Sequence, residues 1–82
     1  MNYSILIKVT YVNDEIIRFL EQKMQQNNID CFFAAQLTGI PLKRIQEVFE
    51  EGAALKGSEF LYFCRALKIS SAELKGFMEK IV

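Results

Sequence analysis

The sequence contains no histidine, and this absence removes the side chain that most often serves as a general base near neutral pH. It also lacks a glycine-rich phosphate-binding loop and any pattern that pairs a nucleophile with an activating base. We therefore expect no enzymatic activity. Only two cysteines are present, and they form no CxxC pair, so we expect neither a metal site nor a cofactor.

Cysteine usage and hydropathy both favour a cytoplasmic location. Cys31 and Cys64 each fall in an apolar segment with helical spacing. A disulfide between them is one interpretation, and two reduced thiols packed as small apolar side chains is the favoured one. Residues 1–12 are apolar but Lys8 interrupts them, and they carry no charged leader or cleavage site. We expect no contact with a membrane.

Neither sign of charge is in excess, because ten basic and ten acidic residues cancel. A neutral chain gives no general electrostatic support for binding nucleic acid, so such a function would have to depend on where individual charges lie. The length of 82 residues and a hydrophobic content of 51% predict one small globular domain with a single core.

Residues 3–12 have the alternation of a β-strand. Because a lone strand needs a partner for its backbone groups, we predict an amino-terminal arm, residues 1–12, that pairs with the same strand of a second copy in a homodimer. The alternative is an edge strand or ordered arm packed on the helices of residues 13–82. The apolar face of this strand would be Tyr3, Ile5, Ile7, Val9 and Tyr11.

The remaining residues predict five helices, so the fold class is all-α with an added amino-terminal strand. The expected N-caps are Asn13, Asp30, Ser58 and Ser70, which each precede an apolar-periodic segment, and Pro41 suits a first helical turn. Ser70 and Glu73 also match a capping box. The buried positions predicted in the first, fourth and fifth helices are Ile16, Ile17, Leu20, Met24, Phe60, Leu61, Cys64, Leu67, Leu74, Phe77, Met78 and Ile81.

The segment from Asp30 to Glu50 has the pattern of a helix-turn-helix. Ala35 is small enough for two helices to cross closely, and Gly39 can adopt the left-handed conformation that ends the first of them. Ile45 then buries the inner face of a second helix that begins near Pro41. An ordinary helical hairpin is the alternative interpretation of this pattern.

The order of these segments resembles the lambda-repressor-like, Cro/CI (Xre) family of bacterial and phage DNA-binding domains. The similarity covers about Ile16 to Leu74 and includes Ala34-Ala35-x-x-x-Gly39-Ile40, Ile45-x-x-Val48 and the exit Leu67-Lys68-Ile69-Ser70. The resemblance implies a five-helix fold that binds palindromic duplex DNA as a homodimer and regulates transcription. The second motif helix would lie in the major groove.

Carried over to this sequence, the resemblance places the DNA-reading residues at the start of the second motif helix. Lys43 suits guanine and Gln46 suits adenine, whereas Arg44 would reach a phosphate or brace the helix. The full predicted interface is Leu42, Lys43, Arg44, Gln46, Glu47 and Lys56.

Two features favour an alternative function as a protein-interaction module, an adaptor or antagonist of another regulator. Phe32 and Phe33 stand where the family commonly has polar residues, and Glu47, Glu50 and Glu51 outnumber the nearby basic residues. We expect the two phenylalanines to be covered by the amino-terminal strand, as part of the dimer interface, or to form a patch for another protein.

Overall fold

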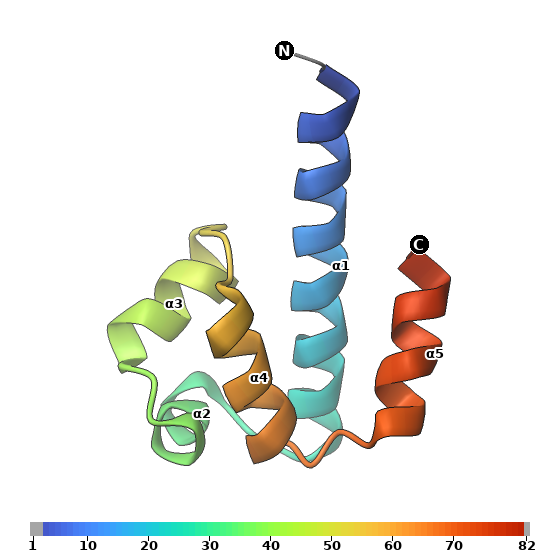
Figure 1. The fold of residues 1–82 in the computed structure, drawn as a ribbon. Coiled ribbons are helices and arrows are strands. Elements are labelled where there is room, and N and C mark those ends of the chain that lie inside the picture. The colour runs from blue at the N-terminus through green and yellow to red at the C-terminus, as the bar shows by residue number, and fades with distance from the viewer. Residues whose placement is uncertain (1–2, 82) are drawn as a thin grey trace.

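A computed structural model describes the backbone of residues 3–81 and the side chains of residues 13–80, and it is helical throughout its ordered elements (Figure 1). The described residues contain no β-strand, so the prediction of an all-α fold with five helices is confirmed. The helices are α1 (Tyr3–Gln26), α2 (Cys31–Thr38), α3 (Leu42–Glu50), α4 (Gly57–Ala66) and α5 (Ser71–Ile81).

The predicted amino-terminal strand is wrong, because residues 3–12 form the first half of α1. A helix satisfies its own backbone groups, whereas a strand in this chain would have no second strand beside it. The same residues also carry a helical pattern, since Ile5, Val9, Val12 and Ile16 are three or four positions apart. The predicted two-stranded ribbon between two copies is therefore wrong as well, and homodimerisation stays a prediction. The side chains assigned to that ribbon, Tyr3, Ile5, Ile7, Val9 and Tyr11, lie outside those that the structure describes.

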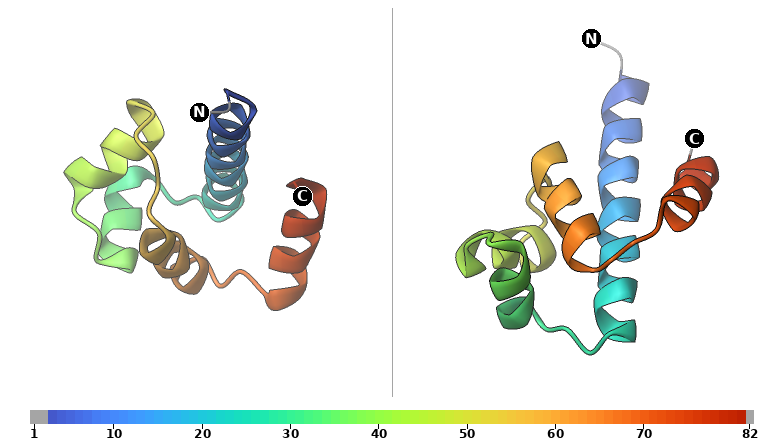
Figure 2. Two further views of the ribbon diagram at one scale, coloured as in Figure 1. Left: turned by 45° about the horizontal axis from the view of Figure 1, so that its top comes forward. Right: turned by 60° about the horizontal axis from the view of Figure 1, so that its bottom comes forward.

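The helices are arranged around α1. In three views α2, α3 and α4 lie on one side of α1 and α5 lies on the other (Figures 1 and 2). The core forms where α1 meets the first group, with Leu20 and Ile45 at 0% and 1% exposure. Between residues 13 and 80, the buried apolar residues are Leu20, Met24, Ala34, Ile40, Ile45, Val48, Phe63, Leu67 and Phe77.

Two of the predicted N-caps are confirmed. Asp30 caps α2, with its carboxylate accepting a hydrogen bond from Phe33 N at 2.8 Å, and Ser70 Oγ accepts one from Glu73 N at 3.1 Å. Pro41 is the N-cap of α3, one position before the predicted first turn. Asn13 is an internal residue of α1 rather than its cap, because the helix continues through it.

The inner face of α4 differs from the predicted one. Phe63, which the sequence pattern left outside, is 1% exposed, whereas the predicted core residue Leu61 is 64% exposed. The helix begins at Gly57 after the N-cap Lys56, not after Ser58. Buried positions then follow every fourth residue, at Glu59, Phe63 and Leu67. In α5, Phe77 is buried as predicted but Met78 is 45% exposed.

Candidate nucleic-acid interface

The turn between α2 and α3 is held by a compact set of hydrogen bonds. Gly39 adopts a left-handed conformation with φ of 78°, and its N–H donates to Ala35 O at 3.0 Å. Thr38 Oγ1 donates to Ala34 O at 2.7 Å and accepts from Ile40 N at 3.1 Å. These contacts fix the angle at which α3 leaves α2. A side chain with a Cβ at Gly39 would strain this conformation.

The outer side of α3 carries most of the residues predicted to read DNA. Lys43 is exposed, and Leu42, Gln46 and Glu47 are half-buried on the same helix. Lys56 is exposed and lies in the loop that leads into α4. The structure therefore brings Leu42, Lys43, Gln46 and Glu47 together on α3, whereas Lys56 lies in the loop before α4.

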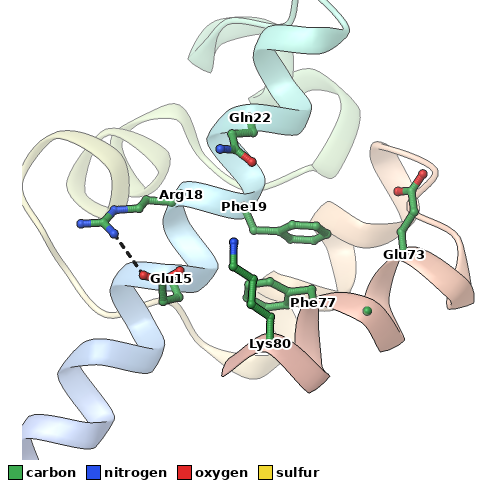
Figure 3. A pocket seen from close by; sticks show the side chains of 8 residues that line it. Glu15, Arg18, Phe19, Gln22, Glu73, Phe77 and Lys80 are labelled. Carbon is green, nitrogen blue, oxygen red and sulfur yellow. Dashed lines mark hydrogen bonds and ion pairs between the residues drawn. The ribbon is translucent and has the colours of Figure 1, made fainter. Parts of the chain in front are cut away.

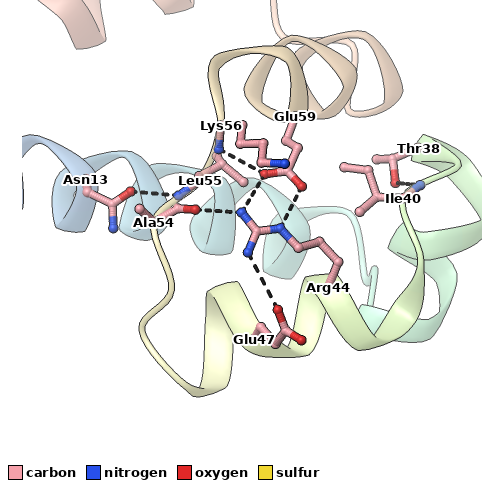
Figure 4. A network of polar contacts seen from close by, with 9 residues as sticks. All are labelled: Asn13, Thr38, Ile40, Arg44, Glu47, Ala54, Leu55, Lys56 and Glu59. Carbon is pink, nitrogen blue, oxygen red and sulfur yellow. Dashed lines mark hydrogen bonds and ion pairs between the residues drawn. The ribbon is translucent and has the colours of Figure 1, made fainter.

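Arg44 has a different environment from the other predicted interface residues. Its Nε donates to Glu59 Oε2 at 2.8 Å, and one terminal nitrogen donates to Glu59 Oε1 at 2.9 Å and to Ala54 O at 2.6 Å (Figure 4). The other terminal nitrogen lies 3.7 Å from a carboxylate oxygen of Glu47. Of the two roles predicted for Arg44, the structure shows the brace, which joins α3 to the following loop and to α4.

Glu59 completes this brace and was not singled out by the sequence pattern. Its carboxylate also accepts a hydrogen bond from Lys56 N at 2.9 Å, so it caps α4 as well as holding Arg44. An acidic residue in the first turn of a helix is a recognisable capping signal. Its pairing with Arg44, fifteen positions earlier, joins two different helices and cannot be predicted from the spacing of residues within one helix.

The ion pair changes the protonation behaviour of both partners. The hydrogen bond from Arg44 lowers the pKa of Glu59, against the raising effect of burial, and the Lys56 N–H adds to the lowering. The same hydrogen bond raises the pKa of the Arg44 guanidinium, with burial opposing it. Both groups are therefore charged at neutral pH.

The lowered pKa of Glu59 predicts that the brace is sensitive to acid. A carboxyl group with a depressed folded-state pKa contributes stability above its ordinary pKa of about 4.3, and that contribution is lost as the pH falls through the folded value. We expect the free energy of unfolding, measured with urea, to fall more between pH 7 and pH 3 for the unchanged chain than for Glu59→Gln. Equal losses in both proteins would show that Glu59 does not carry this pH dependence.

The surface of α2 is more apolar than a phosphate-contacting helix would be. Phe32 and Phe33 are 60% and 46% exposed, and α2 lies beside the end of α1 that is remote from the amino terminus (Figure 1). The prediction that the chain's own amino-terminal segment covers these rings is therefore wrong. Two predictions remain: that a second copy covers the rings in a homodimer, or that they form a patch that meets another protein.

Charge on the candidate interface is sparse. Glu59 and Glu47 accompany the guanidinium of Arg44, so its charge is matched within the chain. Lys43 and Lys56 are exposed, and neither takes part in an ion pair among residues 13–80. These two lysines are the cations that could meet phosphate or a base edge. The half-buried Glu47 and the exposed Glu50 and Glu51 limit how closely a polyanion can approach the other end of α3.

A hollow of about 560 Å³ lies between α1 and α5, away from α3 (Figure 3). Its centre is formed by Phe19 and Phe77, whose rings stack with centroids 4.4 Å apart. Next to them, Lys23 Nζ pairs with a carboxylate oxygen of Glu73 at 2.8 Å. Two acidic and two basic side chains line the hollow, so it has no charge preference. These contacts attach α5 to α1 and give no reactive arrangement.

Comparisons of the chain with protein-family models, with curated proteins and with solved structures found no significant match. Among the helices that the structure describes, none has both the length and the apolar content needed to cross a bilayer.

Proposed function

We propose that this chain is a small cytoplasmic transcriptional regulator that binds duplex DNA as a homodimer, with α2 and α3 acting as a helix-turn-helix of the lambda-repressor-like type. The observation that carries the proposal is the placement of α3. The turn at Gly39 precedes α3, Arg44 and Glu59 join the first turn of α3 to α4, and Lys43 stays exposed on its outer side. A firmly held helix with an exposed lysine in its first turn is suited to enter a major groove.

Each side chain of the predicted interface has a role in this proposal. Lys43 donates to the acceptors of guanine, Gln46 pairs with adenine through its amide, and Leu42 contacts a thymine methyl group. Lys56 neutralises a phosphate beside the groove. Glu47 accepts a hydrogen bond from a cytosine amino group or keeps Arg44 in place, and Arg44 itself positions α3 without touching the DNA.

The sparse positive charge makes the salt dependence of binding a sharp test. Lys56 is the one phosphate contact assigned to each copy, which predicts a slope of log affinity against log salt of about −1 per bound copy. Fluorescence anisotropy with upstream DNA and with a random duplex, each at two salt concentrations, would measure it. Tighter binding to one sequence supports the proposal, and light scattering on the same sample would show whether the protein is dimeric. A folded sample that binds neither duplex at low salt would reject the proposal.

Substitutions on α3 test which residues read the sequence. We expect Lys43→Ala and Gln46→Ala each to weaken specific binding about tenfold or more, because each removes a base contact worth about 1–3 kcal/mol. The matched control is Lys75→Ala, which removes an exposed lysine from α5 on the other side of α1. Anisotropy titration gives the affinities, and circular dichroism confirms the fold. Unchanged binding in both α3 variants would remove this helix from the reading role.

A second candidate function is a protein-interaction module built on the same fold. It is favoured by Phe32 and Phe33, whose exposed rings would be unusual next to phosphate, and by the acidic end of α3. Under this interpretation, the chain acts as an adaptor or antagonist of another regulator and does not bind DNA. Two results together would favour this function over DNA binding. The unchanged chain would bind no DNA, and Phe32→Ser would lose binding to the partner protein while keeping its fold.

A further inference from the structure

Two adjoining hollows form one groove along α1. The first, of about 390 Å³, lies between α1 and α3, and the second, of about 300 Å³, lies between α1 and the start of α2. Glu21 and Phe49 line both hollows, so the two lie next to each other along α1. The second hollow is mainly apolar, whereas the first has more polar than apolar surface. The apolar part of the floor is partly open to solvent and consists of half-buried side chains from three segments of the chain: Ile17, Ile29 and Phe49.

Acidic side chains surround this apolar floor, and we call the whole feature the acidic groove. Its carboxylates are Asp14 and Glu21 on α1, Asp30 before α2, and Glu50 at the end of α3. Among the side chains of residues 13–80, Arg18 is the one basic side chain in the lining. Four negative charges against one positive give a local balance of −3 in a chain whose net charge is zero. The charge is therefore strongly concentrated at this groove.

Two further contacts keep the groove negative. Arg18 is already paired, because its guanidinium lies 3.0 Å from a carboxylate oxygen of Glu15. Cys31 lines the groove as well, and burial followed by the charges of Glu50, Asp30 and Glu21 raises its pKa. The thiol is thus neutral and a poor nucleophile near pH 7.

The chemistry of the groove excludes two classes of ligand. Phosphate would be repelled by the four carboxylates, so the acidic groove does not contact DNA. Among the side chains of residues 13–80, no group of three or more cysteines and carboxylates is arranged to hold a metal ion. An apolar floor beneath a negative rim matches a partner that has apolar side chains flanked by positive ones.

We infer that the acidic groove binds a basic amphipathic helix of another protein. Apolar side chains at positions i, i+3 or i+4, and i+7 of that helix would cover Ile17, Ile29 and Phe49, and lysine or arginine side chains beside them would pair with the rim. The groove extends along α1 from Asn13 to Gln25, which corresponds to about 18 Å of helix axis. A partner helix of about three to four turns fits this length.

This inference does not depend on DNA binding. Val48 and Phe49 line the groove on the side of α3 that faces α1, whereas Lys43 is exposed on another side of the helix. The inference also differs from the second candidate function in its surface, because Phe32 and Phe33 line neither hollow. Failure of one proposal therefore leaves the others to be judged separately.

The test uses the full chain and three labelled synthetic peptides of fourteen or so residues. One carries leucine at helical spacing with lysine elsewhere, the second has glutamate in place of lysine, and the third has serine in place of leucine. We expect the leucine–lysine peptide to bind at least tenfold more tightly than either of the others in anisotropy titrations at low salt. Binding of the glutamate peptide or the serine peptide with equal affinity would overturn the inference.

Variants locate the binding surface. We expect Glu21→Gln combined with Glu50→Gln to raise the dissociation constant of the leucine–lysine peptide about tenfold, because two ion pairs are lost. The control is Glu79→Gln, which removes an exposed carboxylate from α5, outside the groove. The inference is rejected if the double variant binds as the unchanged chain does, or if the control weakens binding as much. Circular dichroism confirms that each variant is folded.

Discussion

We expect Phe63→Ala to lower the free energy of unfolding by about 3–5 kcal/mol, which is a large part of the stability of so small a domain. Phe63 is 1% exposed, and its ring meets that of Phe49 edge-to-face with centroids 5.6 Å apart. Truncation would leave a cavity at the centre of the packing between α3 and α4. Urea unfolding followed by circular dichroism measures the change.

Leu61→Ala is the matched control, because Leu61 lies on the same helix and is 64% exposed. We expect the control to change the free energy of unfolding by less than about 0.5 kcal/mol. The pair of variants tests which side of α4 faces inward. A larger loss from Leu61→Ala than from Phe63→Ala would contradict the observed orientation of α4.

The second large effect is expected for Glu59→Ala, which removes the carboxylate that Arg44 and Lys56 N share. The variant loses charge-assisted hydrogen bonds and the cap of α4 at the same time, and we expect a cost of about 2 kcal/mol. For a domain of this size, that corresponds to a fall in melting temperature of roughly 10 °C. Thermal unfolding followed by circular dichroism is the measurement.

Two comparisons interpret this result. Glu79→Ala removes an exposed carboxylate of α5 and should leave the melting temperature unchanged. Glu59→Ala combined with Arg44→Met should be less destabilising than the sum of the two single changes, since the single changes disrupt one shared contact. Additive effects would show that Arg44 and Glu59 act separately, and the brace described for α3 would then be incorrect.

The parts of this fold that could be predicted from sequence are those set by local chemistry. Asp30 and Gly39 mark the two ends of α2 because a carboxylate cap and a left-handed residue act within a few positions of themselves. Ser70 marks the start of α5 for the same reason. The buried faces of α1 and α3 follow from apolar spacing, with Leu20 and Ile45 in the core.

The incorrect predictions concern segments whose apolar pattern is compatible with two different structures. Residues 3–12 alternate like a strand and also repeat like a helix, and the strand required a partner that this chain does not contain. In α4, apolar residues occupy both sides, so the periodicity does not choose between Leu61 and Phe63. The choice depends on where the helix starts, and Glu59 fixes that start through Lys56.

The candidate interface was predicted only in part. The position of Lys43 and Gln46 on one helix follows from spacing alone. The commitment of Arg44 to Glu59 does not, because it joins residues from separate helices. The acidic groove is also invisible in the sequence, since Asp14, Asp30 and Glu50 come from segments far apart in the chain.

The loop between α3 and α4 has little tolerance for a change in length. Surface loops generally accept insertions, because longer closure costs little entropy. Here three successive residues each make a fixed contact: Ala54 O accepts from Arg44, Leu55 N donates to Asn13 Oδ1 at 3.1 Å, and Lys56 N donates to Glu59. One added residue would put these contacts out of register together. The length of the loop thus sets the distance from α3 to both α1 and α4. In natural variants of this chain, we expect the length of the loop to vary less than its amino-acid composition.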